Sequence, residues 1–359
     1  MGNYRCFNEV CNNHFMKILI TGGAGFFGDI LKKVALSNGH SCVSIDLQPD
    51  EFTHPDFTAI QGDIRNSEVL ENIFARYQFD AIFHCAAILA HAMKDKNFLW
   101  TSNVEGTKKV RDMAIKFKVP KIIFTSSNCL WGGDMGRPVR EQDEPKPIEI
   151  YGCSKWEGEK ILLERTDAID VIIFRCPTII DSGRLGLLAI LFAFIDEGRK
   201  VWVVGGGKNT YQFIYAPDLA DAFMKGLEFR GSEVFNIGSD QVPSFKNMYE
   251  SVIRRAGTGA RVTNIPRSVA IPVMKLAYAL GVSPLGPYQY KMIAENFVFD
   301  TSKIKEKLHW KPSTTNEEML WKAYEYYHAH RDMLEARTDV SAHKQPAKMG
   351  IIRILKWLS

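Results

Sequence analysis

The sequence predicts an α/β fold in which a doubly wound parallel sheet precedes a smaller, mostly helical C-terminal domain. Three observations support this prediction. Short β-branched apolar runs alternate with helical patterns through the first half of the chain, a glycine-rich turn follows the first run, and the alternation weakens after about residue 180. Because repeated strand–helix units place helices on both faces of a sheet, the alternation favours parallel strands.

The composition and charge of the chain exclude several other classes of protein. Its 359 residues suffice for one large or two small domains, and 46% of them are hydrophobic. A net charge of +4 is too small to indicate nucleic-acid binding. The seven cysteines lack metal-ligand spacing, so we expect no metal site, and they suit the reducing cytosol. With no signal peptide and no apolar run near the ~20 residues that span a bilayer, we expect a cytoplasmic protein.

The predicted elements of the first half follow one another at short intervals. Strands are expected at 17–20, 42–45, 57–61, 81–84, 121–125 and 171–175. Helices are expected from residue 26 onward and at 67–76, 97–117 and 151–163. Ligands bind at the carboxyl ends of the strands in such sheets, so the functional residues are expected where these strands end.

The turn after the first strand carries three glycines at three-residue spacing, Gly22, Gly25 and Gly28. Such a turn is typical of a dinucleotide cradle, in which the glycines allow a tight turn, a close approach of the pyrophosphate and close packing of the helix. The phosphates would lie at the positive N-terminus of that helix, beside Phe26 and Phe27. We therefore predict a Rossmann-type dinucleotide-binding domain at 16–180.

Asp46 follows the second predicted strand. Its carboxylate is placed to bind two ribose hydroxyls and to repel a 2′-phosphate, which favours NAD over NADP. The alternative is that Asp46 is a solvated turn residue.

A second group of residues has the spacing of a proton-transfer site. Tyr151 and Lys155 lie four residues apart on one predicted helix and share a face of it, and Ser127 follows a strand upstream. Lys155 is expected to lower the pKa of the Tyr151 phenol, so that the phenolate accepts a substrate proton while hydride passes to nicotinamide. Ser127 would hold the substrate oxygen. The spacing alone also fits a surface pair, but behind a dinucleotide cradle it indicates carbinol oxidation.

Together these motifs resemble those of the extended short-chain dehydrogenases/reductases, within the NAD-dependent epimerase/dehydratase family. The resemblance covers about residues 16–330 and is carried by the segments 21–28, 62–63, 84–87, 103–107, 125–127, 151–155, 213–222, 235–238 and 308–312. It implies NAD bound near Pro177, a contact of Asp63 with adenine, and a homodimer formed through two long helices. The other residues that it places at the cofactor or at the adjoining sheet end are Ile64, Ala86, Ala87 and Asn103.

The residues after Ser127 depart from the pattern of the dehydratases in this family. Sugar-nucleotide 4,6-dehydratases carry Asp-Glu where this chain has Asn128 and Cys129, so water elimination is not expected. Cys129 occupies the place of an acid/base cysteine in GDP-sugar 3,5-epimerases. Its thiol would be catalytic if its pKa were lowered, and is otherwise a small packing residue. The expected substrate-binding residues are Ser127, Asn128, Thr178, Arg184 and Tyr211.

The arginines that anchor a nucleotide diphosphate in this family are missing. Tyr211 and Gln212 lie near the position of the first, and the segment 288–292 contains only Lys291. Arg175 and Arg184 remain as phosphate partners. The fold is therefore indicated more firmly than a UDP-sugar substrate.

The second half of the chain is assigned to a substrate-binding domain at 181–335. A helix is expected at 185–195, a strand and turn at 202–207, a helix at 217–227 and a strand at 233–237, with segments near 201–238 returning to the main sheet. The rest is mainly helical and includes an apolar stretch at 269–280. Residues 1–15 are polar, and we expect them to be disordered.

The segment 336–359 is predicted to be a polar linker followed by an amphipathic helix from residue 349. At about 100° per residue, the apolar side chains of 351–358 cover one arc, while Arg353 and Lys356 lie opposite. The favoured interpretation is that this helix docks on the protein or across a dimer. The alternative is peripheral contact with an anionic membrane surface.

Three functions are compatible with these observations. The first is an NAD-dependent epimerase that transiently oxidises a sugar carbinol, in a nucleotide sugar. The second is an NAD-dependent dehydrogenase or reductase of a non-nucleotide, lipid-like alcohol or ketone, which the missing arginines and the apolar stretch favour. The third, a non-catalytic dinucleotide-sensing protein, conflicts with the presence of Ser127, Tyr151 and Lys155.

Overall fold

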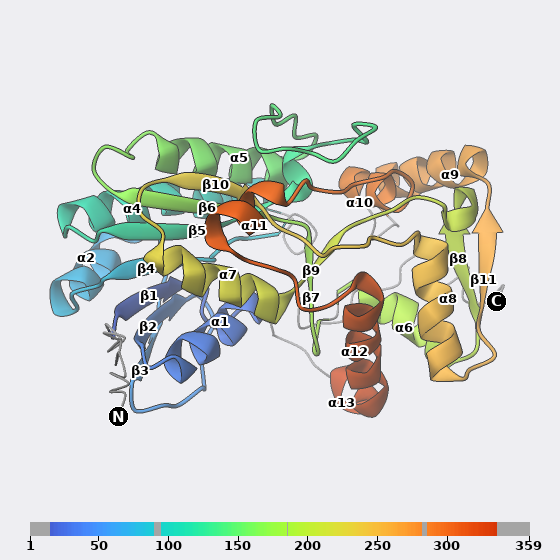
Figure 1. The fold of residues 1–359 in the computed structure, drawn as a ribbon, viewed down its shortest axis with the longest axis horizontal. Coiled ribbons are helices and arrows are strands. Elements are labelled where there is room, and N and C mark those ends of the chain that lie inside the picture. The colour runs from blue at the N-terminus through green and yellow to red at the C-terminus, as the bar shows by residue number, and fades with distance from the viewer. Residues whose placement is uncertain (1–14, 90–94, 185, 282–285, 336–359) are drawn as a thin grey trace, which may run out of the picture.

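A seven-stranded parallel sheet forms the centre of the computed structural model, which describes residues 15–89, 95–184, 186–281 and 286–335 (Figure 1). The strand order is β10-β6-β5-β4-β1-β2-β3, and every neighbouring pair is parallel. The strands are β1 (Lys17–Thr21), β2 (Ser41–Asp46), β3 (Phe57–Gln61), β4 (Ala81–His84), β5 (Lys121–Ser127), β6 (Asp170–Cys176) and β10 (Glu233–Asn236). The predicted doubly wound fold is thereby confirmed.

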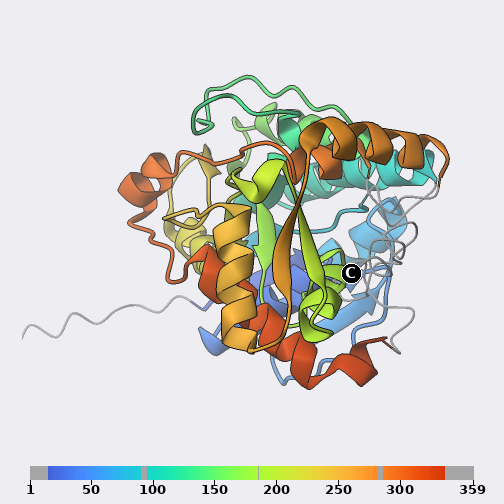
Figure 2. The same cartoon turned by 90° about the vertical axis from the view of Figure 1, so that its right-hand side faces the viewer.

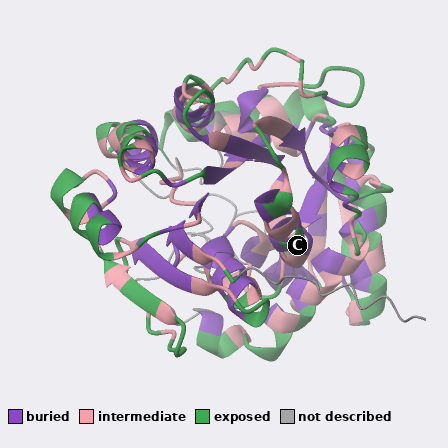
Figure 3. Cartoon of the chain, turned by 60° about the vertical axis from the view of Figure 1, so that its left-hand side comes forward, coloured by how far each residue is buried: buried purple, intermediate pink, exposed green. Residues whose placement is uncertain are grey.

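Helices cover both faces of this sheet because its central strands are apolar on both sides. In β1, Ile18, Leu19 and Ile20 have no exposed surface. One face packs against α1 (Phe26–Ser37), α7 (Ala216–Glu228) and α11 (Ser302–Leu308). The other packs against α2 (Ser67–Arg76), α4 (Gly106–Lys116) and α5 (Ile150–Leu163). In Figure 3 the buried strands lie between helices whose outer surfaces are exposed.

The helix expected at 97–117 consists of three continuous segments. An α-helix, α3 (Lys96–Trp100), leads into the π-helical turn η1 (Thr101–Glu105), which continues as α4. A π-helical turn changes the direction of side chains within a helix and is frequent at functional sites. Here it contains the buried Asn103.

A second lobe, which we call the substrate lobe after the substrate-binding domain predicted at 181–335, lies beside the carboxyl edge of the sheet and is mostly helical, as predicted (Figures 1 and 2). Its helices are α6 (Leu188–Asp196), α8 (Phe245–Ala256), α9 (Arg267–Ala279), α10 (Pro287–Met292), α12 (Asn316–Ala329) and α13 (Arg331–Glu335). Its core joins α6 to α12, where the ring of Phe192 lies 5.8 Å from that of Tyr324 and 5.7 Å from that of Tyr327. Within the described ranges, no helix is both long and apolar enough to cross a membrane.

Two short parallel pairs of strands also lie outside the main sheet. They are β7 (Thr178–Ile180) with β9 (Phe213–Tyr215), and β8 (Lys200–Val204) with β11 (Arg261–Ile265). Of the segments near 201–238, α7 and β10 lie on the main sheet, whereas β8 pairs with β11 in the substrate lobe.

The order of strands reverses at β1, which lies between β2 and β4. At such a reversal the loops that follow two neighbouring strands diverge and leave a crevice at the carboxyl edge of the sheet. The loops after β1 and β4 approach closely here, since a Cβ atom on Gly22 would lie 2.8 Å from the amide nitrogen of Ala86. The predicted cofactor residues are therefore positioned by the topology of the sheet.

Candidate active site

The glycine loop between β1 and α1 has no space for side chains. Gly22 has a φ of +77°, a region that L-residues with a side chain rarely adopt. A Cβ atom on Gly28 would lie 2.1 Å from the carbonyl oxygen of Gly22, so the helix could not pack this closely on the loop. Gly25, the N-cap of α1, provides no side-chain acceptor for the first N–H groups of the helix. A helix N-terminus without a side-chain cap fits the binding of an anion.

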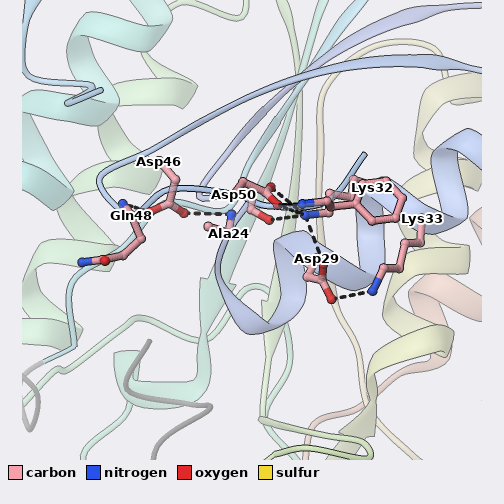
Figure 4. Close-up of polar contacts among 9 residues, drawn as sticks. Ala24, Asp29, Lys32, Lys33, Asp46, Gln48 and Asp50 are labelled. Atoms are coloured by element: carbon pink, nitrogen blue, oxygen red, sulfur yellow. Dashed lines mark hydrogen bonds and ion pairs between the residues drawn. The ribbon is translucent and has the colours of Figure 1, made fainter. Parts of the chain in front are cut away.

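Asp46 ends β2 beside this loop (Figure 4). Its carboxylate accepts hydrogen bonds from the amide of Ala24, at 3.1 Å, and from the amide of Gln48, at 3.0 Å. Burial raises the pKa of Asp46, and these two hydrogen bonds oppose the shift. The two contacts orient the side chain at the edge of the crevice, so the solvated-turn alternative does not describe it.

The sequence analysis did not identify the buried ion pair that lies beside Asp46. Lys32 of α1 has no exposed surface, and its ammonium lies 2.6 Å from Asp50 and 3.0 Å from Asp29 (Figure 4). The same ammonium is 3.4 Å from the carbonyl oxygen of Gly23. Lys32 thus ties the segment after β2 to both the helix and the glycine loop. A lysine among apolar helix residues gives no signal of this role in the sequence.

The remaining predicted cofactor residues surround the same crevice. Asn103 holds the chain after Ala86 and Ala87: its amide group accepts a hydrogen bond from the Ile88 amide, at 2.7 Å, and donates to the Ile88 carbonyl, at 3.0 Å. It also donates to Ser154 of α5, at 3.0 Å, so it joins β4 to the helix of the proton-transfer residues. This geometry agrees with its expected role as a support for the sheet end.

Asp63 lies at the far side of this region and is bound to Arg65, with 2.6 Å between the carboxylate and the guanidinium. Ile64 is buried next to it, and Pro177 is buried between β6 and β7. The adenine contact of Asp63 stays a prediction. Taken together, a tight glycine-rich cradle, a helix end without a side-chain cap and an oriented carboxylate fit the pyrophosphate and ribose of NAD.

The proton-transfer residues meet where β5 ends and α5 begins. Glu149 caps α5 by accepting hydrogen bonds from the amides of Tyr151, at 3.1 Å, and Gly152, at 2.8 Å. This cap fixes the first turn of the helix. The Ser127 side chain lies close enough to the Tyr151 phenol to lower its pKa, and Lys155 lies one turn further along α5. The structure therefore brings Ser127, Tyr151 and Lys155 together.

One electrostatic expectation for this trio was wrong. Burial raises the pKa of Tyr151, and the charges of Cys129 and Glu149 raise it further. The neighbouring Ser127 side chain opposes this rise. The Lys155 ammonium lies over the ring of Phe124, 3.8 Å from its centroid, and burial lowers the pKa of Lys155 itself to about 8. The phenol is thus neutral in this arrangement. A cation brought beside it, such as the charged nicotinamide ring, would favour the phenolate.

Two of the predicted substrate residues, Asn128 and Tyr211, form a neutral hydrogen-bonded network with Tyr288. Asn128 donates to the hydroxyl of Tyr211, at 2.5 Å, and that hydroxyl lies 2.6 Å from the hydroxyl of Tyr288. Thr178 lies beside Tyr211, and Cys129 beside Tyr288. Tyr288, on α10, was not among the substrate residues predicted from the sequence. Its segment, 288–292, was considered only as the place of a missing phosphate-binding arginine.

Cys129 does not meet the condition set for an acid/base thiol. Burial raises its pKa to about 12, and the charge of Glu149 raises it further. The thiol is therefore protonated at neutral pH, and its contacts with Ser127 and Tyr288 are those of a buried packing residue. The surroundings of Cys129 therefore favour the packing role over a catalytic thiolate.

The two candidate phosphate partners differ in availability. Arg175 is buried and fully engaged, with its guanidinium 2.7 Å from Glu159 and 2.8 Å from the Glu141 carbonyl, so its expected role was wrong. Arg184 lies over the ring of Phe26, 5.6 Å from its centroid, at the start of α1. Burial lowers the pKa of Arg184 to about 10, and the negative charge of ionised Tyr151 would oppose that shift. Arg184 is thus positioned between the cofactor cradle and the phenol.

This arrangement can transfer one proton at a substrate oxygen. We expect the Tyr151 phenol to be the proton-transfer group, with Ser127 next to it, while Asn128 and Cys129 supply no carboxylate. Among the described residues, no group of three or more metal-ligating side chains has the geometry of a metal site.

Comparisons with known proteins agree with this geometry. The model of the NAD dependent epimerase/dehydratase family matches residues 18–238, more than half of the chain. An uncharacterized protein, y4nG, of Sinorhizobium fredii is 34% identical over 97% of this chain and 88% of its own length. A putative UDP-glucose 4-epimerase of Methanocaldococcus jannaschii is 26% identical over 70% of this chain and 86% of its own.

The fold is also that of a solved relative. The crystal structure of the UDP-glucose 4-epimerase of Thermotoga maritima with UDP-glucose superposes with a TM-score of 0.73 at 24% identity. The match covers 89% of this chain and all of that one.

Proposed function

The chain belongs to the NAD-dependent epimerase/dehydratase family and uses NAD, and within that family we propose that it epimerises a sugar carbinol, in a nucleotide sugar. One observation carries the proposal: Tyr151 and the neighbouring Ser127 lie next to neutral Asn128 and Cys129. Oxidation and reduction of a carbinol need one proton-transfer group. Water elimination needs a further acid/base pair, which this site lacks.

The residues of the chain handle the proton of the reaction. Bound NAD would supply a reversible hydride acceptor for the carbinol carbon. The Tyr151 oxygen accepts the proton of the substrate hydroxyl as that carbon is oxidised, and Ser127 donates a hydrogen bond to the substrate oxygen. After the ketone has turned in the site, hydride returns to its other face and Tyr151 returns the proton. The phenol must be ionised to accept this proton, and Ser127 is the neighbour that lowers its pKa.

Two features support a nucleotide sugar as the substrate. Arg184 remains as a guanidinium near both the cradle and the phenol, where it could bind a diphosphate. The network of Asn128, Tyr211 and Tyr288 offers amide and hydroxyl groups, which suit sugar hydroxyls. The related Thermotoga maritima enzyme was crystallised with UDP-glucose.

A second candidate is a net NAD-dependent dehydrogenase of a non-nucleotide alcohol. The engagement of Arg175 with Glu159 favours it, because this removes one of the two cations available for a diphosphate. The two candidates differ in whether reduced cofactor accumulates. The homodimer stays a prediction in either case.

Purified protein should be incubated with UDP-glucose or UDP-galactose, and the products resolved by ion-exchange chromatography. An epimerase interconverts the two sugars while the absorbance of reduced nicotinamide in solution stays constant. A dehydrogenase instead reduces added NAD in proportion to product. If neither sugar reacts and a panel of non-nucleotide alcohols reduces NAD, the epimerase proposal is wrong; the Tyr151→Phe protein serves as the inactive control.

A further inference from the structure

Helix α9 presents an aliphatic face to solvent. Val269, Val273, Leu276 and Leu280, the last of them the C-cap residue, are 53%, 55%, 62% and 67% exposed. Their spacing of four, three and four residues keeps them within a narrow arc of the helix. We call these four residues the α9 stripe.

The opposite face of α9 is the one that holds it on the protein. Ala270 is buried there against Val204 and Ala294, and Met274 packs on the same cluster. The stripe therefore does not result from a loosely attached helix. A contiguous exposed apolar patch of this kind marks an interaction surface. Figure 2 shows α9 at the rim of the substrate lobe, next to the strand pair of β8 and β11.

The segment around the stripe is strongly basic. Residues 251–294 contain six basic and no acidic residues, although the whole chain has a net charge of only +4. Those six residues are Arg254, Arg255, Arg261, Arg267, Lys275 and Lys291. Arg255 and Arg267 are paired with Glu318 and Glu295.

Three of the basic residues, Arg254, Arg261 and Lys275, are exposed and form no ion pair within the described part of the chain. Lys275 lies on α9 itself, and Arg261 begins β11. An aliphatic stripe that belongs to a segment with uncompensated positive charge is complementary to an anionic surface with an apolar interior.

We propose that the α9 stripe docks on the surface of an anionic lipid bilayer. The four aliphatic side chains would enter the boundary between headgroups and acyl chains, while Lys275 contacts lipid phosphates and the basic segment attracts the anionic surface. A protein partner would be expected to offer acidic side chains for these charges, and a second copy of α9 would place like charges together. This docking does not depend on which reaction the site performs.

The docking has a consequence for the substrate site. Helix α10, which carries Tyr288 of the hydrogen-bonded network, packs against α9. A bilayer bound to the α9 stripe would therefore lie close to the substrate side of the crevice and not to the cofactor side.

The test is flotation of the full-length protein on vesicles. Vesicles of phosphatidylglycerol and phosphatidylcholine should bind the protein, and vesicles of phosphatidylcholine alone should bind it at least about tenfold more weakly. The Val273→Ser/Leu276→Ser double variant should lower the affinity for the anionic vesicles by about tenfold or more. The matched control, Met135→Ser/Met333→Ser, removes two apolar side chains that are 39% and 46% exposed elsewhere, and should bind as the native protein does.

Two charge variants distinguish membrane binding through α9 from binding through the basic tail at 336–359, which every variant retains. Lys275→Glu should weaken binding several-fold, whereas Arg230→Glu makes the same charge change at an exposed position outside the basic segment and should not. Thermal unfolding and NAD binding of each variant verify that its fold is intact.

Two results would overturn the proposal. Equal flotation of the native protein and the Val273→Ser/Leu276→Ser variant would assign vesicle binding to another part of the chain. Absence of flotation, together with a native dimer that this variant converts to a monomer in light scattering, would make the α9 stripe a subunit interface.

Discussion

The two sides of the crevice are built in different ways. On the cofactor side, glycine backbone and charged side chains are held by short-range contacts, such as those of Asp46 with the amides of Ala24 and Gln48. On the substrate side, Asn128, Tyr211 and Tyr288 come from three distant parts of the chain and are all neutral. The cofactor side suits a ligand that does not vary, the dianionic pyrophosphate of NAD. The substrate side suits sugar hydroxyl groups, whose arrangement can vary.

This difference assigns binding and selectivity to separate groups of residues. Backbone N–H groups and a helix end bind a pyrophosphate whatever the neighbouring side chains are. A buried network of hydroxyl and amide groups discriminates more sharply, because a substrate that fails to satisfy it leaves polar groups unpaired. Substitutions on the cofactor side should therefore change cofactor affinity, while those on the substrate side should change turnover or specificity.

The largest expected effect is that of Tyr151→Phe, at the junction of the two sides. Turnover should fall by roughly a hundredfold or more, since the phenol is the proton-transfer group. NAD affinity should stay close to that of the native protein. The half-buried Tyr326, in the substrate lobe, provides the control Tyr326→Phe. Turnover of Tyr151→Phe near the native rate on an identified substrate would remove the assigned role.

Gly28→Ala tests whether the cofactor side depends on backbone packing. The added Cβ would lie 2.1 Å from the Gly22 carbonyl, so helix and loop must separate, at a cost of about 1–3 kcal/mol in the free energy of unfolding. NAD affinity, measured by calorimetry, should fall as well. Gly259→Ala is the matched control, because a Cβ atom there meets nothing within 4 Å. Equal NAD affinity in both variants would contradict the assigned cradle.

Asp46→Ser addresses cofactor choice on the same side. The native protein should prefer NAD, and loss of the carboxylate should reduce that preference by about tenfold, through weaker ribose binding and loss of repulsion toward a 2′-phosphate. Calorimetric titration with NAD and NADP measures the ratio. The exposed Asp56 offers the control Asp56→Ser, which should leave the ratio unchanged. A native protein that binds both cofactors equally would refute the role of Asp46.

The smallest expected effect concerns His84. Its imidazole is buried below the crevice and hydrogen-bonded to Thr21 and Thr107. Burial lowers its pKa from 6.5 to about 3, and the charge of Lys155 lowers it further. Between these values the unfolded chain binds more protons than the folded one, so the free energy of unfolding falls as the pH falls through this window. His84→Gln should reduce this dependence by up to about 1.4 kcal/mol per pH unit.

Urea unfolding of the native and His84→Gln proteins at several pH values measures that dependence. His54 is largely exposed, so His54→Gln should keep the native acid dependence. If His84→Gln and the native protein lose stability equally between pH 6.5 and 4, His84 does not remain neutral in the fold.

The cofactor side was predictable because its signals are local in the sequence. A strand, three glycines and a helix occur within 17–37, and the spacing of Tyr151 and Lys155 already fixed their common face of α5. Parallel strands then bring their carboxyl ends to one edge, so residues after successive strands had to converge. The family resemblance added residues such as Asn103, whose contacts with Ile88 the structure supplies.

The substrate side and the electrostatics were not predictable in this way. Whether Arg175 is available depends on its partner Glu159, and the role of Tyr288 depends on how α10 packs against the end of β5. The pKa of Cys129 and of Tyr151 depends on burial, which no spacing records. Likewise, the apolar stretch at 269–280 was visible in the sequence, but its exposure on α9 was not.

The sequence by itself determined the doubly wound sheet, the dinucleotide cradle and the trio of Ser127, Tyr151 and Lys155, because strand periodicity, glycine geometry and helical spacing are properties of neighbouring residues. Only the tertiary structure decided which charges are paired, which thiols and phenols are desolvated, and which apolar side chains meet solvent. Those properties belong to contacts between residues far apart in the sequence, such as Asn128 with Tyr211, 83 positions apart. Their energies depend on the local dielectric environment, which exists only after the chain has folded.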